Sequence, residues 1–152
     1  MIRAFQTTDL EAVMELWLRG NLQAHAFIED TYWEQSFDLV KEMLPDAEAY
    51  VYENKATSAV EGFIGLVDNS YIAGIFVKDS ARSQGIGKQL LDYIKADRQR
   101  LTLKVYEKNK RALQFYQREG FQIQSESLDE NTGEQEYEMV WNYNSYPRQS
   151  LR

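Results

Sequence analysis

The chain has 152 residues, of which 43% are hydrophobic and 27% charged, and its formal net charge is −7. That length suits one domain with a single core, no hydrophobic run approaches the roughly 20 residues of a membrane span, and the acidic balance argues against a nucleic-acid-binding face. With no cysteine and one histidine, the sequence offers no disulfide, no thiolate nucleophile and no histidine-rich metal site, so no metal is expected.

The first third of the chain predicts one strand and two helices. Residues 1–6 form a short strand, and a Ser/Thr-x-x-Glu capping box at 8–11 opens a helix through Leu18. A second box at 31–34 opens another helix, which Pro45 ends. Acidic residues interrupt the first segment and make it unlike a secretory signal peptide, which predicts a cytoplasmic protein.

The middle of the chain has the pattern of a small sheet followed by a helix. Stretches of strand character at 47–53, 60–68 and 71–77 are separated by turn-rich segments, which predicts an antiparallel meander. The stretch 81–91 then leads into a helix with apolar residues at helical spacing.

The last third predicts one more helix between strands. Gly120 stands where a left-handed residue would end that helix. Residues 144–152 show no periodicity, which predicts a flexible tail after a single domain spanning 1–143. The elements expected here are a strand at 101–106, a helix at 110–119 and strands at 121–127 and 136–143.

The stretch ARSQGIGKQLL, residues 81–91, places Gly85 and Gly87 where the helix begins. Glycine costs about 1 kcal/mol relative to alanine inside a helix, so helix stability does not explain it. A strand, a glycine-rich turn and a helix direct backbone N–H groups and the positive end of the helix dipole at one point, which favours an anion such as a diphosphate. Arg82 and Lys88 would add positive charge, and a purely packing role for the glycines is the alternative.

The spacing excludes two better-known phosphate loops. A P-loop would need its first glycine where Ala81 and Arg82 stand, and Ser or Thr where Gln89 stands. A dinucleotide-binding fingerprint would need a third glycine at the position of Leu90.

Two segments together resemble the GNAT superfamily of N-acetyltransferases. Residues 82–87, RSQGIG, match its [RQ]-x-x-G-x-[GA] turn, and residues 109–121, NKRALQFYQREGF, match its N-x-x-A-x-x-F-Y-x-x-x-G-F segment. The order of the predicted elements is also that of the superfamily, within which the chain is most similar to small bacterial acetyltransferases of the YjaB and YiaC kind. The resemblance implies an α/β fold of the α+β type, with a central mixed, mostly antiparallel sheet flanked by about four helices.

The resemblance also implies acetyl-CoA as co-substrate, and direct transfer to a primary amine without a covalent enzyme intermediate. The strand at 71–77 would pair its backbone with the pantetheine arm, and an N–H of Ile75 or Phe76 would meet the oxyanion. Tyr116 stands at the position of the family's general acid. The cofactor-binding residues that it implies are Ile75, Phe76, Val77, Arg82, Ser83, Gln84, Gly85, Ile86, Gly87, Lys88 and Asn109.

The general base stays open at this point. His25 is the only side chain whose ordinary pKa lies near neutral pH, and it falls in the connection between the first two helices, which in the family overhangs the acceptor cleft. Other candidates are Glu29, Asp30, Glu61 and a water relay. The aromatic candidates for the acceptor pocket are Phe27, Tyr32, Trp33 and Tyr71.

The sequence therefore predicts an acetyl-CoA-dependent N-acetyltransferase whose amine acceptor is a small molecule or a protein. The alternative is an acyl-CoA-binding sensor, or a partner-binding module, that keeps the fold without turnover. Neither nucleic acid nor membrane is an expected partner, and the exposed last strand leaves a homodimer open.

Overall fold

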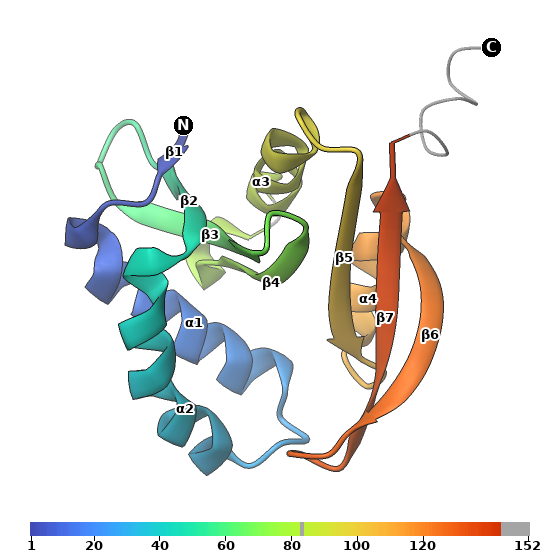
Figure 1. Ribbon diagram of the computed structural model, residues 1–152. Helices are drawn as coiled ribbons and strands as arrows, with labels where there is room; N and C mark the ends of the chain where they lie inside the picture. The colour runs from blue at the N-terminus through green and yellow to red at the C-terminus, as the bar shows by residue number, and fades with distance from the viewer. Residues whose placement is uncertain (83, 144–152) are drawn as a thin grey trace.

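The computed structural model describes residues 1–82 and 84–143, which form one sheet with helices on both faces (Figure 1). The predicted flexible tail, 144–152, lies outside the described residues. The strands are β1 (Ile2–Ala4), β2 (Glu48–Glu53), β3 (Val60–Val67), β4 (Tyr71–Val77), β5 (Arg100–Tyr106), β6 (Gln122–Asp129) and β7 (Glu134–Asn142). The α-helices are α1 (Leu10–Ala24), α2 (Asp30–Met43), α3 (Ile86–Lys95) and α4 (Lys110–Arg118).

The sheet has the order β1-β2-β3-β4-β5-β7-β6. Strands β4 and β5 run parallel, and the other neighbouring pairs run antiparallel. This arrangement confirms the mixed, mostly antiparallel sheet and the meander of β2, β3 and β4. In the part of the chain that the structure describes, no helix is long and apolar enough to cross a membrane.

Each face of the sheet carries its own hydrophobic core. Helices α3 and α4 cover one face over a cluster that includes the fully buried Ile64, Leu90 and Leu103. Helices α1 and α2 cover the other face over Val13 and Val51 (Figure 1). Burying one such side chain stabilises the fold by about 1.5–3 kcal/mol, so the sheet is held from both sides.

The predicted capping box at 8–11 is wrong. A 3₁₀ turn, Thr7–Asp9, precedes α1, and its own capping box joins Gln6 and Asp9. The Asp9 carboxylate accepts the Gln6 N–H at 2.8 Å and forms an ion pair with Arg3 at 2.8 Å. The capping acceptor is therefore the Asp9 carboxylate, which the Arg3 guanidinium holds in place, and not the Thr8 hydroxyl that the sequence predicted.

The predicted capping box at 31–34 is also wrong, and α1 is longer than expected. Helix α2 begins at Asp30 with Glu29 as its N-cap residue, and no side chain caps it. Helix α1 continues past the predicted end at Leu18 to Ala24. In the added turns, Asn21 is buried and its side-chain amide donates to the Trp17 carbonyl at 2.9 Å.

Strands β4 and β5 are paired only at their beginnings. The register joins Tyr71 to Thr102 and Ile72 to Leu103, and the described pairing stops there. Residues 73–77 of β4 therefore have no strand partner on the β5 side, although β3 pairs with the other side of residues 74–77. Backbone polar groups need partners, so this opening in the sheet is a natural place for a ligand.

Candidate active site

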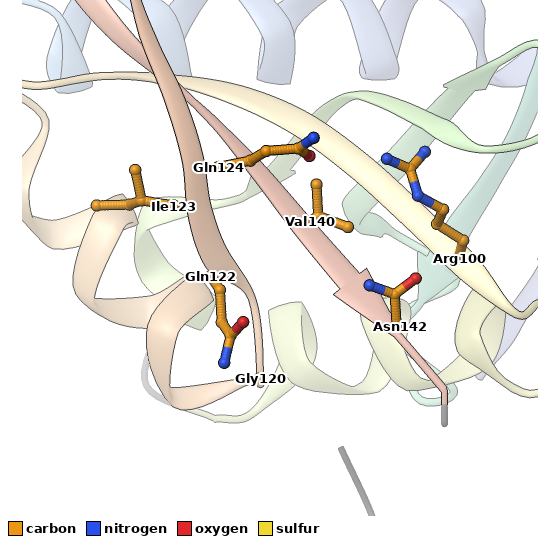
Figure 2. A pocket seen from close by; sticks show the side chains of 7 residues that line it. All are labelled: Arg100, Gly120, Gln122, Ile123, Gln124, Val140 and Asn142. Atoms are coloured by element: carbon orange, nitrogen blue, oxygen red, sulfur yellow. The ribbon is translucent and has the colours of Figure 1, made fainter. Parts of the chain in front are cut away.

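A groove of about 1280 Å³ extends from the opening between β4 and β5. It is lined by residues of α1, β4, the start of α3, β5, α4 and the β6–β7 hairpin. A smaller hollow of about 290 Å³ lies over β5, β7 and β6, where Figure 2 shows Gln122, Gln124 and Asn142. Of its described lining residues, only Arg100 has a titratable side chain, so the larger groove is the candidate site.

The glycine turn forms one wall of this groove. Gly85 is the N-cap residue of α3 and has a left-handed backbone with φ of 79°, which a residue with a Cβ adopts only under strain. At Gly87 an added Cβ would lie 3.5 Å from Phe115 Cζ, an ordinary contact. Backbone geometry therefore requires glycine at 85, whereas packing alone would accept alanine at 87.

The first turn of α3 offers backbone donors to the groove. Gly85, Ile86, Gly87 and Lys88 all line it. The first N–H groups of a helix lack intrahelical partners, and the helix dipole adds partial positive charge there. Of the other residues predicted in this turn, Gln84 is exposed and Ser83 lies outside the described residues.

Positive side chains gather along the groove although the chain as a whole is acidic. Lys110 and Arg111 stand in the first turn of α4, where the helix dipole disfavours cations and an anionic ligand would stabilise them. The prediction weighed the net charge and missed this local excess, whose signal is the run EKNKR at 107–111. The lining cations are Arg82, Lys88, Lys104, Lys108, Lys110, Arg111 and Arg118, against the carboxylates of Glu119, Asp129 and Glu136.

The two cations predicted at the turn both contact carboxylates. Arg82 Nη2 lies 3.2 Å from Asp79 Oδ1. Lys88 Nζ lies 3.1 Å from Glu119 Oε1 and 3.3 Å from Asp92 Oδ2, and its hydrogen bond to Glu119 is the main cause that raises its pKa. These contacts offset part of the charge of both side chains.

The predicted pantetheine-binding residues of β4 use their side chains for packing. Ile75 and Val77 contact the core beneath α3 and α4. Phe76 contacts the other core, where its ring centroid lies 5.5 Å from that of Phe63. Because both faces of the strand are occupied in this way, β4 offers its backbone edge to the groove.

Tyr116 also lines the groove, from α4. Burial raises the pKa of its hydroxyl well above the ordinary value, and the neighbouring Tyr71 raises it further. The phenol therefore stays protonated at neutral pH and can act as a proton donor.

His25 connects the end of α1 to the start of α4. Its Nδ1 lies 3.1 Å from Asn21 Oδ1, and its Nε2 lies 3.2 Å from Asn109 Nδ2. Both amides are oriented by backbone groups, because Asn21 donates to the Trp17 carbonyl and Asn109 Oδ1 accepts the Ala112 N–H at 3.2 Å. The pattern assigns a neutral imidazole that donates from Nδ1 to Asn21 and accepts at Nε2 from Asn109.

Burial lowers the pKa of His25 to about 4. Its ring stacks on Trp33 with centroids 5.2 Å apart and meets the edges of Tyr106 and Phe27 at 5.1 and 5.7 Å. The only basic nitrogen of this ring is occupied by the Asn109 amide, so the geometry favours a positioning role over that of a general base.

The other predicted bases do not line the groove. Glu29 and Asp30 are exposed at the start of α2. Glu61 is a residue of β3, and its carboxylate accepts a hydrogen bond from the Asn54 side chain. Of the aromatic candidates, Trp33 and Tyr71 line the groove, whereas Phe27 and Tyr32 contact residues that line it. The prediction did not include Asp129 and Glu136, which the β6–β7 hairpin brings to the groove.

Comparison with known proteins links this geometry to one family. Residues 45–123 match the model of the acetyltransferase (GNAT) domain. The peptidyl-lysine N-acetyltransferase YiaC of Escherichia coli is 34% identical over 142 residues, which cover 93% of this chain and 96% of that protein. The peptidyl-lysine N-acetyltransferase YjaB of the same organism is 28% identical over 132 residues, covering 87% and 88%. The solution structure of apo YjaB from Escherichia coli has a TM-score of 0.81 and 25% identity over 93% of this chain and 96% of that one.

Proposed function

Because the chain belongs to the GNAT family of acetyltransferases, we propose that it transfers the acetyl group of acetyl-CoA directly to the side-chain amine of lysine residues in proteins. The family establishes acetyl transfer. The lysine acceptor is supported by two relatives, similar over most of their length, that are named for peptidyl-lysine. One observation carries the proposal: a single groove is lined by the unpaired edge of β4, the glycine turn of α3 and Tyr116.

These features suit coenzyme A in three respects. The unpaired backbone of residues 73–77 matches the amides of a pantetheine arm, which would add to the sheet as another strand. The first turn of α3 suits a diphosphate, because its backbone N–H groups lack intrahelical partners and the helix dipole is positive there. The cations along the groove complement a ligand that carries several negative charges. When bound, the cofactor supplies an acetyl group activated as a thioester.

The residues of the groove would then divide the chemistry. The lysine ammonium group must lose one proton to water before its nitrogen attacks the thioester carbon. As the carbon–sulfur bond breaks, the hydroxyl of Tyr116 would donate a proton to the departing sulfur and regain one from the acetylated nitrogen. An N–H of Ile75 or Phe76 stabilises the negative charge that develops on the carbonyl oxygen. His25 would hold the side chain of Asn109 in place through their hydrogen bond. Asn109 caps α4, and in this proposal it also contacts the cofactor.

The test is thiol release from acetyl-CoA in the presence of lysine-containing peptides and a panel of small amines. Wild type should release thiol with the peptides, and Tyr116→Phe should bind CoA normally while turning over far more slowly. Tight binding of CoA by the wild type, with no turnover on any amine, would contradict the proposal and favour the sensor.

A further inference from the structure

We propose that the carboxylate of Glu136, on β7, binds the ammonium group of the acceptor lysine and so selects cationic amines. The inference rests on the proposed function and extends it, because it names the residue that recognises the acceptor. Glu136 lies outside both sequence motifs of the family, residues 82–87 and 109–121.

The sheet register places Glu136 beside the aromatic part of the groove. Glu136 lies directly opposite Tyr106 in the pairing of β5 with β7, so the two side chains share one face of the sheet. The Tyr106 hydroxyl donates to Asp129 Oδ2 at 2.6 Å. All three residues line the groove.

Aromatic rings continue from Tyr106 across the groove to α2. His25 contacts Tyr106 with centroids 5.1 Å apart, Trp33 stacks on His25 at 5.2 Å, and Tyr32 contacts Trp33 at 4.8 Å. The faces of aromatic rings attract cations, and a carboxylate beside such rings is a suitable partner for an alkylammonium group. The aliphatic part of a lysine side chain would pack against the same rings.

Glu136 is the groove carboxylate whose bonding capacity is least used. Its side chain is 14% exposed, and among residues 1–82 and 84–143 its carboxylate accepts no hydrogen bond and has one ion-pair partner, Lys104, at 3.9 Å. By contrast, Asp129 accepts the Tyr106 hydroxyl, and Glu119 contacts Lys88 at 3.1 Å. A largely buried carboxylate is costly unless it is paired, so an incoming ammonium group would be stabilised here.

Electrostatic effects connect Glu136 to the reacting end of the groove. Burial raises the pKa of Tyr71, and the carboxylates of Glu136 and Glu138 raise it further. Tyr71 in turn raises the pKa of Tyr116. An ammonium group bound to Glu136 would therefore lie within electrostatic range of the hydroxyl groups of Tyr71 and Tyr116.

The experiment measures steady-state kinetics with a lysine peptide and acetyl-CoA. Glu136→Gln should raise the KM for the peptide about tenfold, the effect of losing one charged hydrogen bond, with the KM for acetyl-CoA unchanged. Glu138→Gln is the matched control, because Glu138 lies on the same face of β7, accepts a hydrogen bond from Ser125 at 3.2 Å and does not line the groove. Lys104→Met should lower the peptide KM, because Lys104 competes for the same carboxylate.

The outcomes separate this inference from the proposed function. With an active wild type, an unchanged peptide KM in Glu136→Gln overturns the inference alone, and so does an equal rise in Glu138→Gln. A peptide KM that rises in Lys104→Met also overturns it, and this variant tests the idea even if Glu136→Gln does not fold. A wild type that transfers acetyl to no lysine peptide refutes the proposed function, and the inference with it.

Discussion

Alanine substitution should affect the two glycines of the turn in opposite ways. Gly85 has φ of 79°, and an L-residue in this left-handed conformation costs about 1–2 kcal/mol. Gly87 has a helical backbone in α3, and its replacement by alanine should stabilise the helix by about 0.5–1 kcal/mol. The added methyl group would meet Phe115 at 3.5 Å and Val77 at 3.9 Å without overlap.

These energies translate into measurable changes. For a chain of this size, 1 kcal/mol corresponds to a shift in Tm of about 2–4 °C, so Gly85→Ala should lower the Tm and Gly87→Ala should raise it. If the turn of Gly85→Ala relaxes to relieve the strain, CoA must restore its shape on binding, and the Kd should rise about 5–30-fold. The Kd of Gly87→Ala should change less than about threefold, because Gly87 already has a helical backbone in the first turn of α3, which alanine can adopt without strain.

Calorimetry with CoA and thermal unfolding test both variants, and Gly133→Ala is the control. Gly133 has φ of 76° in the β6–β7 turn and does not line the groove, so its substitution should lower the Tm without changing the Kd. The reasoning is refuted if Gly85→Ala leaves both Tm and Kd unchanged, or if Gly87→Ala weakens CoA binding as much as Gly85→Ala does.

Three further predictions concern single side chains. Tyr116→Phe should lower kcat about 10²–10⁴-fold with an unchanged Kd for CoA, and a kcat within threefold of wild type would exclude a role as general acid. Because folding lowers the pKa of His25 from 6.5 to about 4, its contribution to stability is present above pH 6.5 and is lost as the pH falls toward 4. Urea unfolding at pH 7 and 4.5 should therefore show a fall in unfolding free energy that is smaller in His25→Gln than in wild type, by about 2–3 kcal/mol, and equal falls would contradict the neutral imidazole. Asp9→Asn should reduce the unfolding free energy at pH 7 by about 1.5–3 kcal/mol, since it breaks the pair with Arg3, and a change below 0.5 kcal/mol in urea titrations would be inconsistent with that pair.

Most of the fold could be predicted from local patterns. The expected strands at 60–68 and 71–77 correspond to β3 and β4, and Gly120 has the left-handed backbone that its place after α4 predicted. Both predicted capping boxes are wrong, because several side chains near a helix start can compete for its free N–H groups. At the first helix, Asp9 accepts the Gln6 N–H and pairs with Arg3, and at α2 no side chain caps the helix.

The candidate site could be predicted only in part. The glycine turn and Tyr116 are carried by contiguous motifs, and they do line one groove. The contact between His25 and Asn109 joins residues 84 positions apart, which no sequence pattern reveals. The place of Glu136 depends on the register of β5 against β7, and a shift of one residue would turn it to the other face of the sheet.

The short pairing between β4 and β5 has a consequence for the lifetime of the fold. Among the described residues, two pairs join β4 to β5 and so connect the two halves of the sheet, which makes the hydrogen-bond ladder weakest there. A ligand that binds along the unpaired edge of β4 would stabilise this part of the sheet reversibly. At a ligand concentration of a hundred times its Kd, it would add about 2.7 kcal/mol to the unfolding free energy. The survival of this enzyme against unfolding and proteolysis would then follow the supply of coenzyme A around it.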